Sequence, residues 1–177
     1  MNLVPFIARG PVRSSENFFI ILQEKDKNRL CYVTIDLIAG HCLALQLQGV
    51  QSVRPLTHQL IFNTLVELGC VLDKIVITQI IDNSYRATLY IKNPDKLVIE
   101  IDSRPSDAIT LAIIAGCPML INEDLLEMNE ELRTMVDAAE KQAKTNFLSN
   151  KEMLPKKMTE EEAAEFLKNF DPGKKTH

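Results

Sequence analysis

Acidic, basic and hydroxyl side chains are concentrated in one short stretch of this sequence, Glu100-Ile101-Asp102-Ser103-Arg104-Pro105-Ser106-Asp107-Ala108-Ile109. The stretch begins at the end of a predicted β-strand and leads directly into an apolar run that predicts a helix. Backbone amides at the start of a helix have no partner within the helix, so ligands and capping side chains gather there. We therefore expect any functional site to lie at this junction.

The carboxylates of the junction are candidate metal ligands. Asp102 and Asp107 offer the hard oxygen atoms that suit Mg²⁺ or Mn²⁺, and a divalent cation there could polarise a phosphodiester and activate water. The same residues also suit a structural role. In that role Ser103 caps the helix and Pro105 occupies its first turn. Asp107 then complements the helix dipole and pairs with Arg104. Both interpretations remain open.

Further candidate residues lie at two predicted helix starts. His58 is placed in a first helical turn, where a neutral imidazole could act as a general base, or could only hydrogen-bond across the domain. Arg54 and Arg104 each precede a proline at a helix start, and a guanidinium there can bind phosphate or tie down its own loop. Ser106 adds a hydroxyl beside the second arginine.

Composition is that of an ordinary soluble globular protein, with 46% hydrophobic and 25% charged residues. The four cysteines form no C-x-x-C pair, which argues against a zinc site or a disulfide framework and favours a reducing compartment. The N-terminus lacks the features of a signal peptide, and the longest apolar run, 109–121, is too short to span a bilayer. We expect a cytoplasmic protein that does not enter the membrane.

Charge is unevenly distributed along the chain. Residues 1–122 carry 11 Lys or Arg and 11 Asp or Glu, whereas residues 123–177 carry 9 and 13, which accounts for the net charge of −4. Proteins that hold duplex DNA through its phosphates usually show a basic footprint, which this sequence lacks. The sequence also lacks P-loop, HExxH, GxSxG and GxGxxG motifs, which excludes the commonest nucleotide-binding, zinc-protease and hydrolase classes.

The hydrophobic pattern predicts the elements that must position these residues. We expect strands at 3–8, 18–23, 30–35, 71–81, 85–92, 96–101 and 118–121, and helices at 41–48, 58–68 and 104–115. Pro5 confines the first strand to a sheet edge or a strand start. Two halves of the chain share the order hairpin, Ile-Asp, and a short apolar helix ending in Gly. This order predicts an α+β fold, a pseudo-duplicated hairpin-plus-helix core with an antiparallel or mixed sheet, and argues against a Rossmann sheet.

After residue 121 the composition becomes rich in Glu, Ala and Lys. We predict one domain over residues 1–130 and a charged helical extension over 131–177, with a helix from Asn122 to Leu148 and a linker near 149–157. The capping box Thr159-Glu160-Glu161-Glu162 predicts a last helix with two phenylalanines on its apolar stripe. A short helix with exposed phenylalanines is expected to dock on another surface, either the core or a second subunit. We expect a homo-oligomer, with a dimer as the first choice.

Two separated motifs resemble signatures of the bifunctional nuclease (BFN) domain family. Asp102-Ser103-Arg104-Pro105-Ser106-Asp107-Ala108-Ile109 matches the family's D-x-R-P-S-D-A-I in full, and Arg54-Pro55-Leu56-Thr57-His58-Gln59-Leu60 is similar to its R-P-L-T-H-D-L. The resemblance covers roughly residues 3–130. It implies a nuclease-type hydrolase that cleaves phosphodiester bonds of DNA or RNA with a divalent metal, Mg²⁺ or Mn²⁺. The implied roles are metal binding by Asp102 and Asp107, substrate binding by Arg54, Arg104 and Ser106, and catalysis by His58 and Asp107.

Two positions depart from the family pattern. Ala39 occupies a position where relatives place a Glu in a pattern such as I-G-x-x-E-A, and Gln59 replaces the Asp that follows the histidine. If those acids bind metal or move protons in active relatives, this chain would be weak or inactive. The alternative function is therefore a non-catalytic ligand- or protein-binding regulatory module of the same fold.

Overall fold

The computed structural model describes residues 1–13, 18–25, 29–50, 52–82, 84–128 and 134. The chain divides into two units, Met1–Glu140 and Lys141–His177, and the described residues all belong to the first. The predicted linker near 149–157 and the predicted last helix lie outside the described residues. The boundary near residue 130 stays a prediction.

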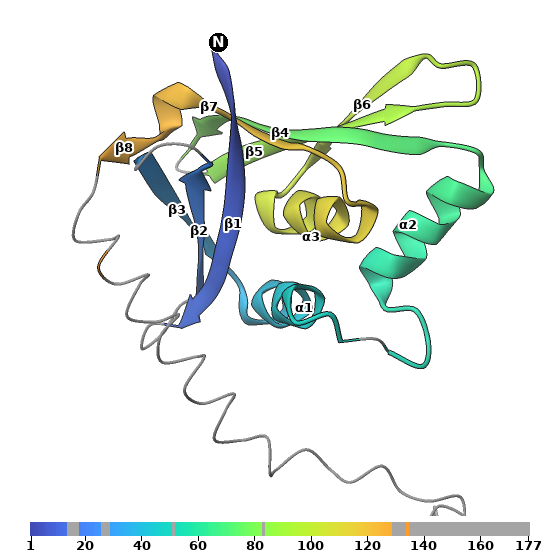
Figure 1. Cartoon of the computed structure of the whole chain (residues 1–177), viewed down its shortest axis with the longest axis horizontal. Helices are drawn as coiled ribbons and strands as arrows, with labels where there is room; N and C mark the ends of the chain where they lie inside the picture. The colour runs from blue at the N-terminus through green and yellow to red at the C-terminus, as the bar shows by residue number, and fades with distance from the viewer. Residues whose placement is uncertain (14–17, 26–28, 51, 83, 129–133, 135–177) are drawn as a thin grey trace, which may run out of the picture. The chain divides into compact units, whose positions relative to one another are not determined.

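Strands and helices follow each other in two similar series, which Figure 1 shows. In chain order the elements are β1 (Leu3–Arg13), β2 (Phe18–Glu24), β3 (Arg29–Ile35), α1 (Leu37–Leu47), α2 (Thr57–Glu67), β4 (Val71–Ile81), β5 (Ser84–Lys92), β6 (Val98–Ser103), α3 (Pro105–Ala115), β7 (Met119–Asn122), the 3₁₀ turn η1 (Glu123–Leu125) and β8 (Glu127–Met128).

The strands form one mixed sheet in the order β6-β5-β4-β7-β1-β2-β3-β8. Strands β1-β2-β3 and β4-β5-β6 are two antiparallel meanders, and each is followed by a helix, α1 or α3. Strand β7 lies between them, parallel to β4 and antiparallel to β1. The two meanders therefore run in opposite directions, as an approximate two-fold axis through the sheet requires. This arrangement confirms the predicted α+β class.

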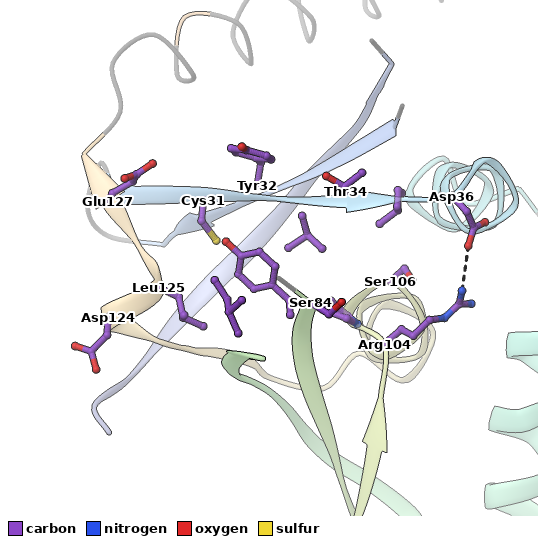
Figure 2. Close-up of a pocket in the computed structure, with 15 residues that line it drawn as sticks. Cys31, Tyr32, Thr34, Asp36, Ser84, Arg104, Ser106, Asp124, Leu125 and Glu127 are labelled. Carbon is purple, nitrogen blue, oxygen red and sulfur yellow. Dashed lines mark hydrogen bonds and ion pairs between the residues drawn. The ribbon is translucent and has the colours of Figure 1, made fainter. Parts of the chain in front are cut away.

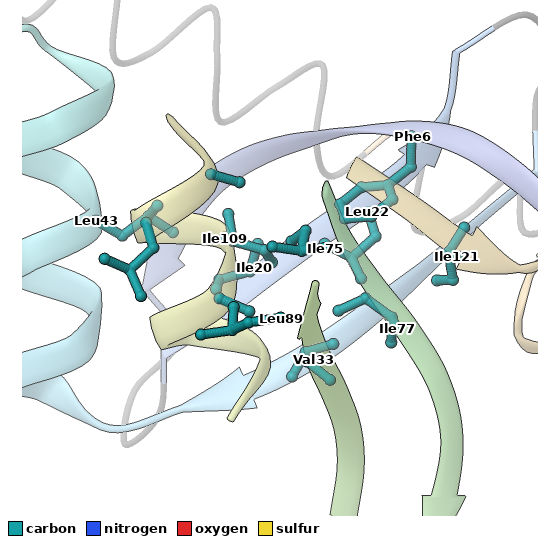
Figure 3. Packing of buried hydrophobic residues seen from close by; sticks show 14 of the residues in the cluster. Phe6, Ile20, Leu22, Val33, Leu43, Ile75, Ile77, Leu89, Ile109 and Ile121 are labelled. Carbon is teal, nitrogen blue, oxygen red and sulfur yellow. The ribbon is translucent and has the colours of Figure 1, made fainter. Parts of the chain in front are cut away.

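The core lies between the sheet and the helices, with α3 packed against α1, α2, β4 and β5. Alternate residues of β5, Ala87, Leu89 and Ile91, face this core, as expected for a strand with one buried face. Figure 3 shows Ile109 of α3 and Leu43 of α1 among side chains from both meanders. One continuous core thus joins the two halves, and it holds the first turns of α1 and α3 in fixed positions.

Helix α1 begins at Leu37, one turn earlier than the predicted start at His41. Asp36 caps it, because its Oδ1 accepts a hydrogen bond from the Ala39 amide at 2.8 Å. The prediction relied on the apolar stripe, but the first turn presents Leu37 and Ile38 to solvent. The capping residue, not the stripe, therefore sets the start of this helix.

Pro5 is the third residue of β1, near the start of the strand, as expected. It is the last residue that pairs with β7, and pairing with β2 begins at Phe6. One other expectation about element positions is wrong. The helix predicted from Asn122 is replaced by the end of β7, η1 and β8, which pairs with β3. From residue 129 onward, only Thr134 is described.

Replacing Leu43 by Ala should lower the free energy of unfolding by about 2–5 kcal/mol, because a fully buried leucine would leave a cavity. Leu37→Ala in the same helix removes a side chain that is 64% exposed, and should change stability by less than about 0.5 kcal/mol. Urea unfolding measures both changes in stability, provided that the variants and the wild type show equal m-values. Equal losses for the two variants would contradict the packing of α1.

Candidate functional site

Arg104 is the N-cap residue of α3, and its guanidinium bonds two carboxylates. Its Nε donates to Asp107 Oδ2 at 2.6 Å, and its Nη2 donates to Asp107 Oδ1 at 3.1 Å. Its Nη1 donates to Asp36 Oδ2 at 3.0 Å, the contact drawn in Figure 2. The bidentate geometry fixes the plane of the guanidinium. These contacts raise the pKa of Arg104, chiefly through the hydrogen bonds to Asp107.

Asp36 connects the same arginine to the start of α1. One carboxylate oxygen accepts from the Ala39 amide, and the other accepts from Arg104. The amide hydrogen bond is the main cause of a lowered pKa for Asp36, and the nearby guanidinium adds to it. Asp36 thus remains ionised at neutral pH. Asp36 therefore connects the start of α1 to the start of α3, and these two helices occupy corresponding places in the two halves of the fold.

Asp107 connects the arginine to His58 on α2. His58 Nε2 lies 3.0 Å from Asp107 Oδ1. Burial raises the pKa of Asp107, but hydrogen bonds from Arg104 and His58 outweigh this effect, so its pKa lies below the usual value. Because an ionised carboxylate only accepts hydrogen bonds, Nε2 carries the proton. In the neutral ring the lone pair then lies on Nδ1, which has no hydrogen-bond partner among the described residues.

The start of α3 offers donors that no side chain caps. The helix's first backbone hydrogen bond runs from Ala108 to the Arg104 carbonyl, so the amides of Ser106 and Asp107 have no partner within the helix. Ser103 does not cap the helix as predicted, because its hydroxyl donates to the carbonyl of Arg104 at 3.1 Å. Two amides and the positive end of the helix dipole therefore remain available to an anion.

Ser106 places a further hydroxyl at this helix start. The residue is 5% exposed, and its side chain has no hydrogen-bond partner among the described residues. It lines a pocket of about 630 Å³ together with Arg104, Asp36 and Tyr85. Figure 2 shows that Ser106 and Arg104 lie at the same end of this pocket. Two residues predicted to bind substrate therefore share one cavity wall.

Asp102 and Arg54 are not brought into this network. Asp102 pairs with Arg86 at 3.2 Å, and its register partner Thr88 lies on the sheet face opposite to that of Ala87, which α3 covers. Its role as a metal ligand stays a prediction. Arg54 is exposed, two residues before the N-cap of α2, and has no ion pair or side-chain hydrogen bond within the described part of the chain. The two Arg-Pro pairs are thus not equivalent, because only Arg104 is an N-cap.

The two positions that depart from the family motifs lie in first helical turns. Ala39 is 5% exposed at the third position of α1, and its uncharged side chain leaves Arg104 with two carboxylate partners among the described residues. Gln59 holds the start of α2, where its Oε1 accepts from the Leu56 amide at 3.1 Å. Gln59 thus supplies the capping contact that an acid could supply at this position.

The comparisons with known proteins agree with the motifs. Residues 20–134, well over half of the chain, match the bifunctional nuclease domain family. This chain belongs to that family, and membership indicates a nucleic-acid-binding or nuclease-like role. Two uncharacterized proteins of Mycobacterium tuberculosis, from strains CDC 1551 and H37Rv, are each 29% identical to it over 140 residues. The aligned part spans 74% of this chain and 83% of each relative.

Sequence reasoning missed one residue of the network, Asp36. The available signal was its position after a strand and before a run of non-proline residues, where Asp is a preferred N-cap. The sequence could not indicate that its second oxygen would meet Arg104. Among the described residues, none of the helices has the length and apolar character needed to cross a membrane.

Replacing Asp107 by Asn should lower the free energy of unfolding at pH 7 by about 1–2 kcal/mol, because charge-assisted hydrogen bonds to Arg104 and His58 are lost. The folded-state pKa of Asp107 is lowered, so its stabilisation is present above the unfolded pKa of about 3.9 and is lost as the pH falls below that value. The difference between wild type and variant should therefore shrink below about pH 4.

Asp102→Asn is the matched control, because it removes an exposed pair with Arg86 and should cost less than about 1 kcal/mol. Urea unfolding at pH 7, 5 and 3.5 measures the series. If Asp107→Asn lowered the free energy of unfolding by the same amount at all three pH values, the ionised network would be contradicted.

Proposed function

We propose that this chain is a nuclease-type hydrolase that cleaves phosphodiester bonds of DNA or RNA with a divalent metal. The observation that carries the proposal is the 3.0 Å contact between His58 and Asp107 beside the uncapped start of α3. This contact brings a candidate general base, the carboxylate that would orient it and a helix start suited to phosphate into one network. Nucleophile activation by a base that a third group orients is a recurring arrangement in hydrolases.

The phosphate would bind at the N-terminus of α3. The amides of Ser106 and Asp107 and the hydroxyl of Ser106 supply neutral donors there. Arg104 uses one hydrogen of each Nη atom for its carboxylate contacts, which leaves two N–H groups for phosphate oxygens. Arg54, exposed in the segment before α2, would contact a neighbouring phosphate of a longer substrate.

The charges of the network support a requirement for a cation. Arg104 with Asp36 and Asp107 carries a net charge of −1, which would repel a phosphate that arrived alone. Among the described residues there is no group of three or more His, Cys, Asp or Glu placed to hold a metal. Mg²⁺ is often held by one or two carboxylates and keeps several waters, so Asp107 would suffice as its protein ligand, and Mn²⁺ would fit similarly. The ion would neutralise phosphate charge and acidify a bound water.

His58 would act as the general base. Its Nδ1 takes a proton from a water molecule while the water oxygen forms a bond to phosphorus. The bond from phosphorus to the leaving oxygen breaks, and that oxygen takes a proton from solvent. Asp107 holds the ring through Nε2, so the base keeps the tautomer that this transfer needs.

The alternative is a non-catalytic ligand-binding module, and one observation favours it. Helix α2 contains no buried residue, and in the described part of the chain His58–Asp107 is the one side-chain hydrogen bond between α2 and α3. On this alternative the contact only anchors α2. This alternative would be supported if His58→Gln lowered the free energy of unfolding while the wild type showed no metal-dependent cleavage.

His58→Gln should reduce cleavage of a labelled oligonucleotide by about 10²–10⁴-fold, the range typical of losing a general base. The same loss is expected when EDTA removes Mg²⁺ or Mn²⁺. His41→Gln is the matched control, because His41 is exposed on α1 and no contact links it to the network. It should cleave like the wild type. Equal cleavage by both variants would rule out catalysis by His58.

Assembly into a homodimer and a cytoplasmic location stay predictions. The exposed edge strand β6, on which Val98, Ile99 and Ile101 are 44–52% exposed, supports the first of these. Light scattering of the full chain measures its mass.

A further inference from the structure

The pocket beside Arg104 extends well beyond the phosphate-binding end of the candidate site. Its volume of about 630 Å³ falls within the range of roughly 300–1,000 Å³ that small-molecule sites occupy. Strand β3 forms one wall, and β5 with the start of α3 forms the opposite wall (Figure 2). These strands are far apart in the sheet order, so the curled sheet encloses the pocket between its two halves.

One end of the pocket is polar and suits an anion. Arg104, the start of α3 and the hydroxyl of Ser106 lie there, together with Asp36, which accepts a hydrogen bond from Arg104. The Ser106 hydroxyl has no hydrogen-bond partner among the described residues, and it is not one of their fully buried side-chain atoms that lack a partner, so solvent reaches it in the free protein. A ligand oxygen at this end would accept the hydrogen bond that the hydroxyl otherwise gives to water.

The other end of the pocket combines apolar and aromatic side chains with two acidic residues. In Figure 2 Tyr32 and Thr34 point away from the pocket, so the alternate residues Cys31 and Val33 face it. Leu125 and the ring of Tyr85 complete this end. Burial raises the pKa of the Cys31 thiol to about 12, so the thiol is uncharged at neutral pH. Asp124 and Glu127 add two carboxylates to this end of the pocket.

We propose that this pocket holds the unstacked nucleobase of the nucleotide whose phosphate lies against Arg104 and the start of α3. An anionic group joined to a flat ring with amino donors matches a pocket that has Arg104 at one end and apolar side chains beside the acidic residues Asp124 and Glu127 at the other. The inference rests on the proposed function and specifies its substrate class. A base that is paired and stacked in a duplex cannot enter a pocket, so the preferred substrates are single strands and unpaired ends.

Isothermal titration of the full chain with adenosine 5′-monophosphate and ribose 5-phosphate, in the presence of Mg²⁺, tests this directly. The two ligands share the phosphate and sugar, so their difference reports the base. We expect the mononucleotide to bind about tenfold more tightly, the size of one base–aromatic stacking contact. Equal affinity for the two ligands, or no binding of the mononucleotide, would overturn the proposal.

Two adjacent positions of β4 provide matched variants. Ile80 and Ile81 are 46% and 40% exposed, but only Ile80 lines the pocket, next to its register partner Tyr85. Ile80→Trp should abolish the tenfold advantage of the mononucleotide, whereas Ile81→Trp should retain it. Ser84→Trp, at another exposed lining position, repeats the test if Ile80→Trp misfolds. If Ile80→Trp and Ile81→Trp bound the mononucleotide with equal affinity, the base would lie elsewhere and the proposal would be overturned.

Cleavage rates separate this inference from the function on which it rests. If the wild type binds the mononucleotide through the pocket but cleaves no nucleic acid, the hydrolase proposal fails and the nucleobase pocket stands. If the wild type cleaves single and double strands equally and Ile80→Trp does not slow it, the pocket proposal fails while the hydrolase stands.

Discussion

The guanidinium of Arg104 is the contact on which the arrangement of this site depends. It bonds Asp107 through two nitrogens and Asp36 through the third, so one cation holds together the starts of α3 and α1. Without it, the carboxylates of Asp36 and Asp107 would lose the cation that both accept hydrogen bonds from and that lowers the pKa of each. Exposed ion pairs contribute little to stability. The continuous core supplies the stability, and Arg104 determines how the helix starts meet.

The same contacts have consequences for function. Asp107 bonds Arg104 and His58 together, so the residue that anchors α2 also sets the tautomer of the candidate base. Anchoring and the proposed catalysis would therefore use the same atoms, and a loss of activity in a single variant is informative only when stability is measured with it. The network's single net negative charge would also link the proposed phosphate binding to a cation, because a substrate phosphate would add further negative charge at this point.

Local patterns in the sequence predicted most of the fold. Alternation within β2 and β5 and the glycine at the end of α3 are local signals, so those elements appeared near their predicted positions. The start of α1 was missed because its first turn is solvent-exposed and carries no stripe. The helix expected from Asn122 was wrong because pairing of β8 with β3 depends on residues nearly a hundred positions away.

The site was predictable in part for the same reason. Arg104 and Asp107 are three residues apart in one helical turn, so their pairing follows from spacing. The contacts of Asp107 with His58 and of Arg104 with Asp36 join distant segments, and only the fold brings them together. Sequence proximity instead suggested that Asp102 would join Asp107, but strand alternation turns Asp102 to the other face of the sheet.

A crystal structure of the full chain with Mn²⁺ and adenosine 5′-monophosphate would show whether Arg104, Asp107 and His58 form a phosphate and metal site. We expect a phosphate within hydrogen-bond distance of Arg104 and Ser106 at the start of α3, an anomalous peak for Mn²⁺ beside Asp107, and His58 still bonded to that carboxylate. A phosphate and a metal bound away from α3, with the Arg104 network undisturbed, would contradict this expectation.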